Sequence, residues 1–205
     1  MVNKENARKE AKAQRKKLFN MIGKNCISKS TLFNFISSIK KKISPKSVGI
    51  YYPIQSEISP FKLIQICNEL DLTLSLPVIS KKSYYLSFKK WDGIEDLKKS
   101  YHGILEPLSY NKLIIPDIIF VPLLAYDKDL NRLGYGKGYY DKTIQKLREK
   151  KSKNNNPFIA VGLAYYEQKI ARVPIKSHDQ KMDIIITEKK ILHKKRDISI
   201  WRFYL

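Results

Sequence analysis

The sequence contains few of the residues that would indicate a secreted, metal-binding or membrane-spanning protein. Only two cysteines, Cys26 and Cys67, occur in 205 residues, which is too few for a disulfide framework, and their spacing matches no metal site. The longest apolar run, residues 113–126, is interrupted by two prolines and an aspartate, so it is not a membrane span. The N-terminus lacks the apolar stretch of a secretory signal and carries two glutamates, which argues against a transit peptide. We therefore expect a cytoplasmic protein that acts away from membranes.

Acidic residues are also scarce, since 19 Asp and Glu stand against 40 Lys and Arg, for a formal net charge of +21. Such an excess can indicate nucleic-acid binding through phosphate contacts. However, only seven of the basic residues are arginine, and the lysines are spread from end to end instead of gathering on one element. We expect that nucleic acid is not required, and a nucleic-acid-binding protein remains one alternative. A small anionic ligand would benefit from the same positive field.

The remaining composition is typical of one globular domain, which we expect to span residues 1–205. Apolar periodicity predicts alternating helices and strands. The helices are expected over 3–22, 30–42, 59–70 and 138–150, and the strands over 47–53, 72–79, 84–91, 117–126, 158–166 and 183–188. Near-continuous apolar strands that alternate with helices indicate a mostly parallel sheet covered on both faces. The prediction is therefore an α/β fold, a single three-layer α/β/α domain with a basic N-terminal helix.

Glycine is rare, yet three of the eight glycines fall within five residues of the segment "RLGYGKGYYDK" at 132–142. The segment follows a predicted buried strand and opens a helix, which is where open α/β sheets bind ligands. It is either a tight turn or a cradle whose backbone N–H groups and helix N-terminus hold phosphate. It is not a Walker loop, because Gly138 follows Lys137, nor a dinucleotide fingerprint, because Tyr139 stands where glycine is needed. The spacing alone does not decide between turn and cradle.

The acidic residues near this segment also have two interpretations. Asp141 is favourable in the first turn of a helix simply because of the helix dipole. A carboxylate beside bound phosphates is also what Mg²⁺ needs. The segment "SHDQKMD" supplies Asp179 and Asp183 as candidate partners, whereas its His178 is more typical of a surface residue than of a catalytic base.

The stretch "DIIFVPLLAYDKDLNRLGYGKGYYDK" at 117–142 resembles the signature of the 5-formyltetrahydrofolate cyclo-ligase family, also called methenyltetrahydrofolate synthetases. The resemblance spans nearly the whole chain in order. It includes "KENARKE", "YYPIQSE" at 51–57, "LPVI" at 76–79, "GILEP" at 103–107 and "VPIKSHDQKMDIIITE" at 173–188. One departure is Leu130, which stands where the family usually has glycine, so we expect that turn to be shaped differently. A second is Lys137, which replaces a frequent third glycine.

The resemblance implies an ATP- and Mg²⁺-dependent cyclisation of 5-formyltetrahydrofolate to 5,10-methenyltetrahydrofolate, with release of ADP and phosphate. The formyl oxygen attacks the γ-phosphate, N10 closes on the activated carbon, and phosphate leaves. Such phosphoryl transfer depends on positioning and charge neutralisation more than on a covalent catalyst. The implied partners are ATP, Mg²⁺ and a reduced folate, and we expect a monomer. The basic charge leads to the hypothesis that folates with polyglutamate tails are favoured. An ATP-utilising homologue with a non-folate substrate is the second alternative.

The resemblance also implies a role for individual residues on the nucleotide side. Lys4 and Arg8 match a basic pair that meets ATP, and their i, i+4 spacing places both on one helix face. Asp141 and Asp179 match carboxylates linked to magnesium, and Asp183 matches a further acid of the family. The matched nucleotide-binding loop comprises Arg132, Leu133, Gly134, Tyr135, Gly136, Lys137, Gly138, Tyr139 and Tyr140.

On the folate side, Glu57 matches a contacting glutamate, because a carboxylate suits the two adjacent donors of the pterin's amino-pyrimidine edge. Tyr52 is expected to pack on the flat ring system. The central loop residues also border the folate, namely Tyr135, Gly136, Lys137, Gly138 and Tyr139. We expect Arg132, Lys137 and Tyr139 to be catalytic. Without the resemblance, Glu57 would be an ordinary residue before a helix and each tyrosine a core aromatic.

Overall fold

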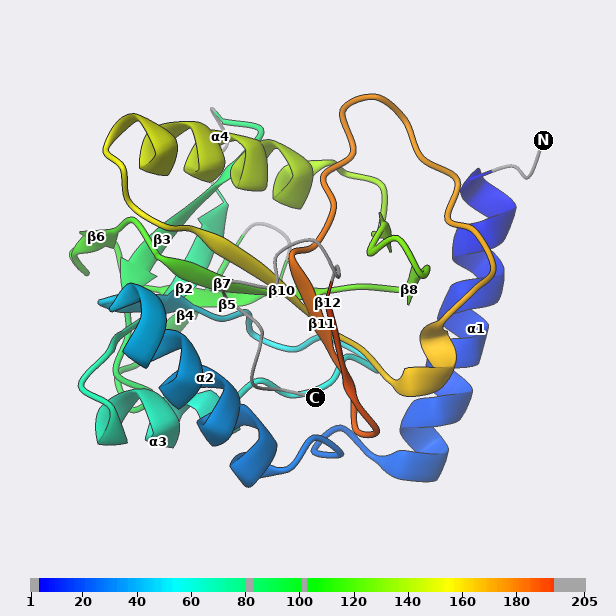
Figure 1. The fold of residues 1–205 in the computed structure, drawn as a ribbon, viewed down its shortest axis with the longest axis horizontal. Helices are drawn as coiled ribbons and strands as arrows, with labels where there is room; N and C mark the ends of the chain where they lie inside the picture. Colours follow the sequence, from blue (N-terminus) through cyan, green and yellow to red (C-terminus); the bar gives the residue numbers. More distant parts are fainter. Residues whose placement is uncertain (1–3, 80–82, 101–102, 194–205) are drawn as a thin grey trace.

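The computed structural model describes residues 4–79, 83–100 and 103–193, and these form a sheet with helices on both of its faces (Figure 1). Eight strands pair in the order β12-β11-β10-β7-β1-β2-β3-β6. The strands from β11 to β2 run parallel, whereas β12, β3 and β6 at the edges run antiparallel to their neighbours. Their bounds are β1 (Ser47–Gly49), β2 (Thr73–Ile79), β3 (Leu86–Lys90), β6 (Leu113–Ile114), β7 (Ile118–Pro122), β10 (Ile159–Leu163), β11 (Ile184–Ile186) and β12 (Ile191–His193). The predicted α/β fold with a mostly parallel sheet is confirmed.

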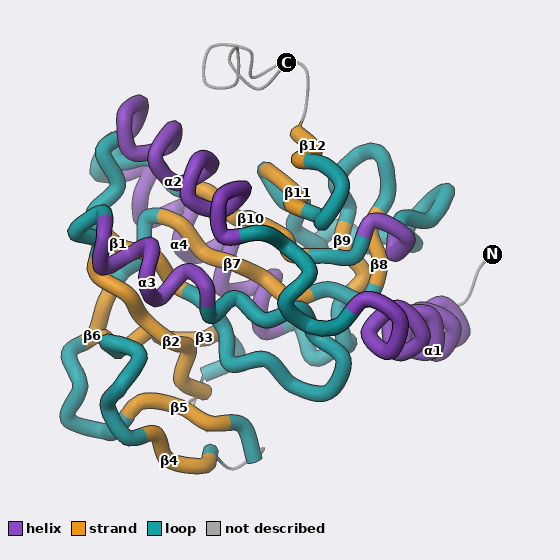
Figure 2. Tube along the Cα trace, turned by 90° about the horizontal axis from the view of Figure 1, so that it is seen from below, coloured by secondary structure: helices purple, strands orange, loops and turns teal. Residues whose placement is uncertain are grey.

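Helices α2 (Lys29–Ile43) and α3 (Lys62–Glu69) cover one face of the sheet, and α4 (Tyr139–Lys153) covers the other (Figures 1 and 2). Helix α1 (Lys4–Ile22), the predicted basic N-terminal helix, lies across the end at which the parallel strands finish. It approaches the short helix η1 (Tyr166–Gln168), which follows β10. No helix in the described ranges combines the length and the apolar character that crossing a membrane requires.

Strand β7 shows why the sheet is buried on both faces. Ile118 and Phe120 belong to the core beneath α2 and α3, and Ile119 and Val121 belong to the core beneath α4. Because side chains alternate along a strand, a strand with apolar residues on both faces needs a helix layer on each side. The near-continuous apolar runs of the sequence thus specify the three-layer arrangement.

The prediction of one strand over 117–126 is wrong, because the chain leaves the sheet after Pro122. Residues Ala125–Tyr126 instead form β8, which pairs with β9 (Arg132–Leu133) in a separate antiparallel sheet. The carbonyls of Leu123 and Leu124, at the break, accept hydrogen bonds from the side chain of buried Gln168, at 2.9 and 2.8 Å. The glycine segment therefore begins in β9, which runs antiparallel to β8, and not in a loop that follows β7 directly.

Other boundaries differ by a few residues or were not foreseen. The four predicted helices and the strand over 84–91 are present, and the strand predicted over 158–166 ends at Leu163 because Tyr166 begins η1. Sequence patterns did not reveal β6, β12 or the hairpin of β4 (Leu97–Lys99) and β5 (Leu105–Pro107), which lies beside β2 (Figure 2). Strands of two or three residues carry too little alternation to be recognised.

Leu130 closes the turn between β8 and β9 in place of the usual glycine. Its φ is +61°, in the left-handed region that is strained for a leucine. Its side chain is buried in the core beneath α4, and its carbonyl accepts a hydrogen bond from the N–H of Met182 at 3.0 Å. The carboxylate of Asp127 braces the same turn by accepting from the N–H groups of Asp129 and Asn131. Packing and this bracing hold the leucine in a conformation that glycine adopts freely.

The partly buried pair of Asp117 and Lys151 connects the start of β7 to the end of α4. Asp117 also accepts hydrogen bonds from the N–H groups of Lys46 and Ser47, at 2.8 and 3.0 Å, and from the Ser47 hydroxyl at 2.9 Å. Burial opposes ionisation of Asp117, but these donors and Lys151 hold its pKa below the usual value. The carboxylate thus joins three segments at the end of the sheet remote from α1.

We expect Asp117→Ala to lower the free energy of unfolding by about 3 kcal/mol, because it leaves a buried ammonium and two backbone donors without their partner. Urea denaturation would measure this loss. Glu69→Ala is the matched control, since it breaks the exposed pair with Lys29, of 2.7 Å, which contributes less than about 1 kcal/mol. Equal effects of the two substitutions would contradict the structural role of Asp117.

Candidate active site

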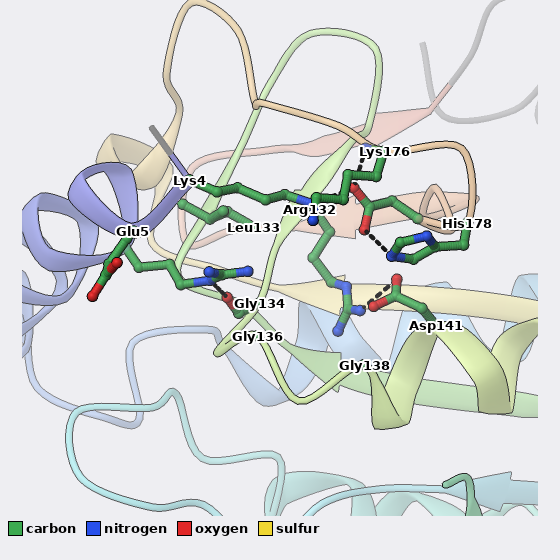
Figure 3. Close-up of a pocket in the computed structure, with 12 residues that line it drawn as sticks. Lys4, Glu5, Arg132, Leu133, Gly134, Gly136, Gly138, Asp141, Lys176 and His178 are labelled. Carbon is green, nitrogen blue, oxygen red and sulfur yellow. Dashed lines mark hydrogen bonds and ion pairs between the residues drawn. The ribbon is translucent and has the colours of Figure 1, made fainter. Parts of the chain in front are cut away.

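Two adjoining cavities lie beside α1, at the carboxyl ends of the parallel strands. The first has a volume of about 340 Å³ and is shown in Figure 3, and the second has a volume of about 510 Å³. Both are lined by the same residues of one segment, Arg132, Gly134, Gly136, Gly138 and Asp141. The glycine segment is therefore the shared wall of the two cavities.

The glycines are required by the geometry of this wall. Gly136 has a φ of +102°, and a Cβ at this position would lie 2.9 Å from Cζ of Arg8. Gly138, with a φ of +72°, is the N-cap of α4 and provides no capping side chain. Glycine thus serves both interpretations of the motif, because it allows the turn and also allows the Arg8 guanidinium to approach the backbone closely. The N-terminus of α4, with its positive dipole end, directly follows this wall.

The first cavity is strongly basic. Lys4 and Arg8 reach it from α1, and Arg8 Nε donates to the carbonyl of Gly134 at 3.1 Å. Arg132 and Lys176 line the cavity from β9 and from the segment before β11 (Figure 3). Four cations around about 340 Å³, next to a helix N-terminus, suit a polyphosphate.

Three carboxylates, Glu5, Asp141 and Asp179, line the same cavity, and the two aspartates pair with its cations. Asp141 accepts from Arg132 at 2.9 Å and from the N–H of Gln180 at 3.0 Å. Asp179 pairs with Lys4 at 2.5 Å and accepts from the N–H of Lys176 at 2.6 Å. Although burial raises the pKa of Asp179, the hydrogen bonds from Lys4 and from the N–H of Lys176 leave it below the usual value. Both carboxylates predicted for magnesium therefore face one cavity.

The donors of this cavity fit Mg²⁺ only if a bound phosphate takes part. Within the described ranges, no three His, Cys, Asp or Glu side chains come together as a metal site. Mg²⁺ is usually held by one or two carboxylates, substrate phosphates and water, and Asp141 and Asp179 match that pattern. Asp183 lines neither cavity; it accepts from the N–H of Ala160 at 2.7 Å and from Arg148 at 2.8 Å, so it joins β10 to α4.

The second cavity is mainly apolar and aromatic, and it contains a buried acid. Tyr51, Tyr52 and Pro122 line it together with Glu57, whose residue exposure is 3%. Burial raises the pKa of Glu57 to about 7, although the N–H of Ile54 donates to it at 2.9 Å and opposes the rise. A flat ligand with two adjacent donors would satisfy this carboxylate and stabilise its ionised form.

The structure brings every predicted ligand-contacting residue to one of the two cavities. Those of the first cavity alone are Lys4, Arg8, Leu133 and Asp179. Those of the second alone are Tyr52, Glu57, Tyr135, Lys137, Tyr139 and Tyr140. Tyr135, Lys137 and Tyr139 were predicted to contact both the nucleotide and the folate, and Tyr140 was predicted to contact the nucleotide alone. None of the four lines the basic cavity.

Sequence reasoning missed Arg15 and Glu106. Arg15 is buried on α1 and donates to Ser56, to the carbonyl of Leu123 and to the hydroxyl of Tyr135. It follows Arg8 by seven residues, two helical turns along the same face, and this spacing was the available signal. Glu106 lies in the matched "GILEP" segment and lines the second cavity.

Comparisons with known proteins find one family of relatives. The family model described as the 5-formyltetrahydrofolate cyclo-ligase family matches residues 1–188. A 5-formyltetrahydrofolate cyclo-ligase of Haemophilus influenzae is 35% identical over 147 residues, which are 69% of this chain and 75% of the relative. The enzyme of that name from Mus musculus is 40% identical over 155 residues, 70% of this chain and 73% of the relative.

Solved structures show the same fold. The 5,10-methenyltetrahydrofolate synthetase of Aquifex aeolicus superposes with a TM-score of 0.70 and 26% identity, over 94% of this chain and 93% of the other. The synthetase of Mycoplasma pneumoniae, with a TM-score of 0.66 over 91% and 99% of the two chains, is 20% identical and supports the fold alone.

We expect Gly136→Ala to weaken ATP binding at least tenfold, because the added Cβ would displace the Arg8 guanidinium and strain the backbone. Gly138→Ala is the matched control, since it has a comparable φ but its Cβ would meet nothing within 4 Å. Titration calorimetry with ATP would measure both variants. Equal losses would show that backbone strain, and not the position of Arg8, determines the affinity.

Proposed function

This chain belongs to the 5-formyltetrahydrofolate cyclo-ligase family, and on that premise we propose that it converts 5-formyltetrahydrofolate and ATP to 5,10-methenyltetrahydrofolate, ADP and phosphate. One observation carries the proposal: the glycine segment is the common wall of a basic cavity and an aromatic cavity with a buried acid. An enzyme that transfers a phosphoryl group to a folate needs sites of these two kinds in contact.

The first cavity is the proposed site of the ATP phosphates. Lys4, Arg8 and Arg132 would bind the phosphate oxygens, and the N-terminus of α4 adds a partial positive charge. The pairs Lys4–Asp179 and Arg132–Asp141 would exchange partners as the phosphates enter, since phosphates and carboxylates compete for the same cations.

The second cavity is the proposed folate site. Glu57 would accept two hydrogen bonds from the amino-pyrimidine edge of the pterin, and the rings of Tyr52 and Tyr139 would pack on its faces. Its volume of about 510 Å³ suits a ligand of this size. The formyl group would then meet the γ-phosphate where the two cavities adjoin, because the attacking oxygen must come within about 3.5 Å of the phosphorus.

The chemistry requires the removal of an oxygen from the formyl carbon. The formyl oxygen attacks the γ-phosphorus, an O–P bond forms, and ADP leaves. N10 then attacks the activated carbon and gives up its proton, and the C–O bond breaks to release phosphate. Arg132, which lines both cavities, is suited to neutralise charge in the phosphoryl transfer, with Lys137 and Tyr139 as the proposed partners on the folate side.

Mg²⁺ bound by Asp141 and Asp179 together with the phosphates would neutralise charge on the transferred group. We further propose that the enzyme works as a single-domain monomer without nucleic acid, because residues of one chain, from Lys4 to Asp179, line both cavities. A cytoplasmic location suits its free thiols, Cys26 and Cys67, and its use of ATP.

The proposal predicts methenyl product, followed by its absorbance, when the protein is incubated with 5-formyltetrahydrofolate, ATP and Mg²⁺. Glu57→Gln should raise the KM for the folate at least tenfold and leave ATP affinity unchanged, because one donor–acceptor pair becomes a donor–donor clash. ATP binding without product would indicate a homologue that uses a different substrate. Tight, salt-sensitive binding of mixed DNA or RNA without turnover would favour a nucleic-acid-binding protein.

For the metal site, we expect Asp141→Asn to raise the Mg²⁺ concentration for half-maximal turnover at least tenfold, because a charged oxygen ligand is lost. ATP affinity measured without Mg²⁺ should not fall. Asp183→Asn is the control, since Asp183 lies outside both cavities and should affect stability alone. An Asp141→Asn enzyme with an unchanged Mg²⁺ requirement would remove the metal assignment.

We propose that a polyglutamate tail on the folate would lie along α1. A third cavity of about 410 Å³ is lined by Lys12 and Lys16 of α1 and shares Lys12 and Gln55 with the second cavity. An acidic tail that leaves the folate site would therefore meet two lysines. We expect the double substitution Lys12→Ala, Lys16→Ala to abolish any gain in apparent affinity that added glutamates give at low salt.

Lys17→Ala is the matched control for the tail, because Lys17 is an exposed lysine of the same helix and lies outside the cavity. If tail length does not change the apparent affinity of the unsubstituted enzyme at low salt, the tail proposal is wrong.

A further inference from the structure

Arg15 is a charged residue in the core, with a residue exposure of 2%. Its guanidinium contacts three separate parts of the chain. It donates to Ser56 Oγ at 3.1 Å, to the carbonyl of Leu123 at 3.3 Å and to the hydroxyl of Tyr135. It also lies 3.7 Å from Glu57 Oε1. Removing a charged group from water costs free energy, and hydrogen bonds and an opposite charge must offset that cost.

The position of Arg15 relative to the cavities is specific. Glu57 and Tyr135 line the second cavity, whereas Arg15 lines the third and not the second. The guanidinium therefore supports the acid and the tyrosine from behind, on the side away from the proposed folate. Tyr135 is further held because its hydroxyl bonds Glu57 and its ring lies 5.3 Å from the guanidinium carbon.

Arg15 is also the cation that opposes the burial of Glu57. The N–H of Ile54 also donates to this carboxylate, at 2.9 Å. The titratable neighbours other than Arg15 are phenols, namely Tyr51 after β1, Tyr135 of the glycine segment and Tyr140 of α4, all neutral at pH 7. Lys12 lines the same cavity from α1, and its side chain is solvent-exposed. Without Arg15, a carboxylate so deeply buried would be protonated at neutral pH and would offer one acceptor fewer.

We propose that Arg15 is a positioning residue of the folate site, which holds Glu57 and Tyr135 in the orientation that the pterin needs and keeps Glu57 in its accepting form. This inference rests on the proposed function. It extends that function to a residue that touches no substrate and acts from behind the wall of the cavity.

The test measures 5-formyltetrahydrofolate binding without ATP, by fluorescence, from pH 5.5 to 9. In the unsubstituted protein, affinity should fall as the pH drops through about 7, because the raised pKa of Glu57 makes this the range of its protonation. Arg15→Met should move this fall upward by at least one pH unit and weaken binding at pH 7 at least tenfold. ATP affinity should stay within twofold, and Arg15→Lys, which keeps the charge, should keep the fall near its original pH.

A purely structural role would lower thermal stability but leave the position of the pH-dependent fall unchanged, and that result would overturn the proposal. Glu57→Gln should abolish the fall, and adding Arg15→Met to it should cost less affinity than Arg15→Met costs alone, because part of the effect of Arg15 acts through this carboxylate and part through Tyr135. If the two substitutions together lowered folate affinity by the product of their separate effects, Arg15 and Glu57 would act independently, and the proposed coupling between them would be wrong. Loss of ATP affinity equal to the loss of folate affinity would indicate a displaced α1 and would also overturn it.

If Arg15→Met does not fold, Arg15→Gln replaces it, since glutamine keeps hydrogen-bonding capacity without charge. If neither folds, Arg15→Lys decides, because a lysine keeps the charge but cannot donate to Ser56, Leu123 and Tyr135 through separate nitrogens. A loss of affinity confined to the folate, with the fall at its original pH, supports the positioning role. Unchanged folate affinity at every pH overturns it. An unsubstituted protein that binds ATP but no 5-formyltetrahydrofolate would contradict the proposed function itself, and with it this role. Binding with an unshifted pH dependence in the neutral variant would contradict the role of Arg15 alone.

Discussion

The site depends on the contact between one face of helix α1 and the glycine segment. Arg8 donates to the carbonyl of Gly134, and Arg15 donates to the hydroxyl of Tyr135. Ala11 packs in the same small core as Leu133, which holds the helix against β9. Because cations at i, i+4 and i+11 follow one helix face, α1 supplies Lys4 and Arg8 to the basic cavity and Arg15 to the back of the aromatic one. Neither cavity is complete without this helix.

The second constraint is that one short segment serves two substrates. Three glycines of this segment, Gly134, Gly136 and Gly138, line the two cavities. The charged residues at its ends, Arg132 and Asp141, also line both of them. Glycine at 136 lets the arginine of α1 lie against the backbone that the two cavities share. A polyphosphate and a flat aromatic ligand would each keep an environment suited to it while both lie against the same segment. Reaction in such a place needs positioning and charge neutralisation more than a nucleophile.

Much of this could be predicted from sequence, because the signals were local. The apolar strands specified a sheet covered on both faces, and a long motif placed the glycine segment before α4. The division of 117–126 could not be predicted, because the chain leaves the sheet where Gln168, more than forty residues away, takes the carbonyls of Leu123 and Leu124. Arg15 could not be distinguished from the other basic residues of its helix for the same reason, since its burial depends on partners from distant segments. The sequence also could not decide whether the segment is a tight turn or a phosphate-binding cradle, because the geometry of Gly136 is compatible with both.

The central claim is that ATP and the folate meet across the glycine segment, so that the formyl oxygen is transferred to the γ-phosphate. The most direct test is a single turnover with 5-formyltetrahydrofolate that carries a heavy oxygen isotope in its formyl group, followed by mass analysis of the phosphate released. The account predicts that the label appears in the phosphate, one heavy oxygen for each methenyl product formed. Phosphate without the label, with the heavy oxygen recovered in water, would contradict it.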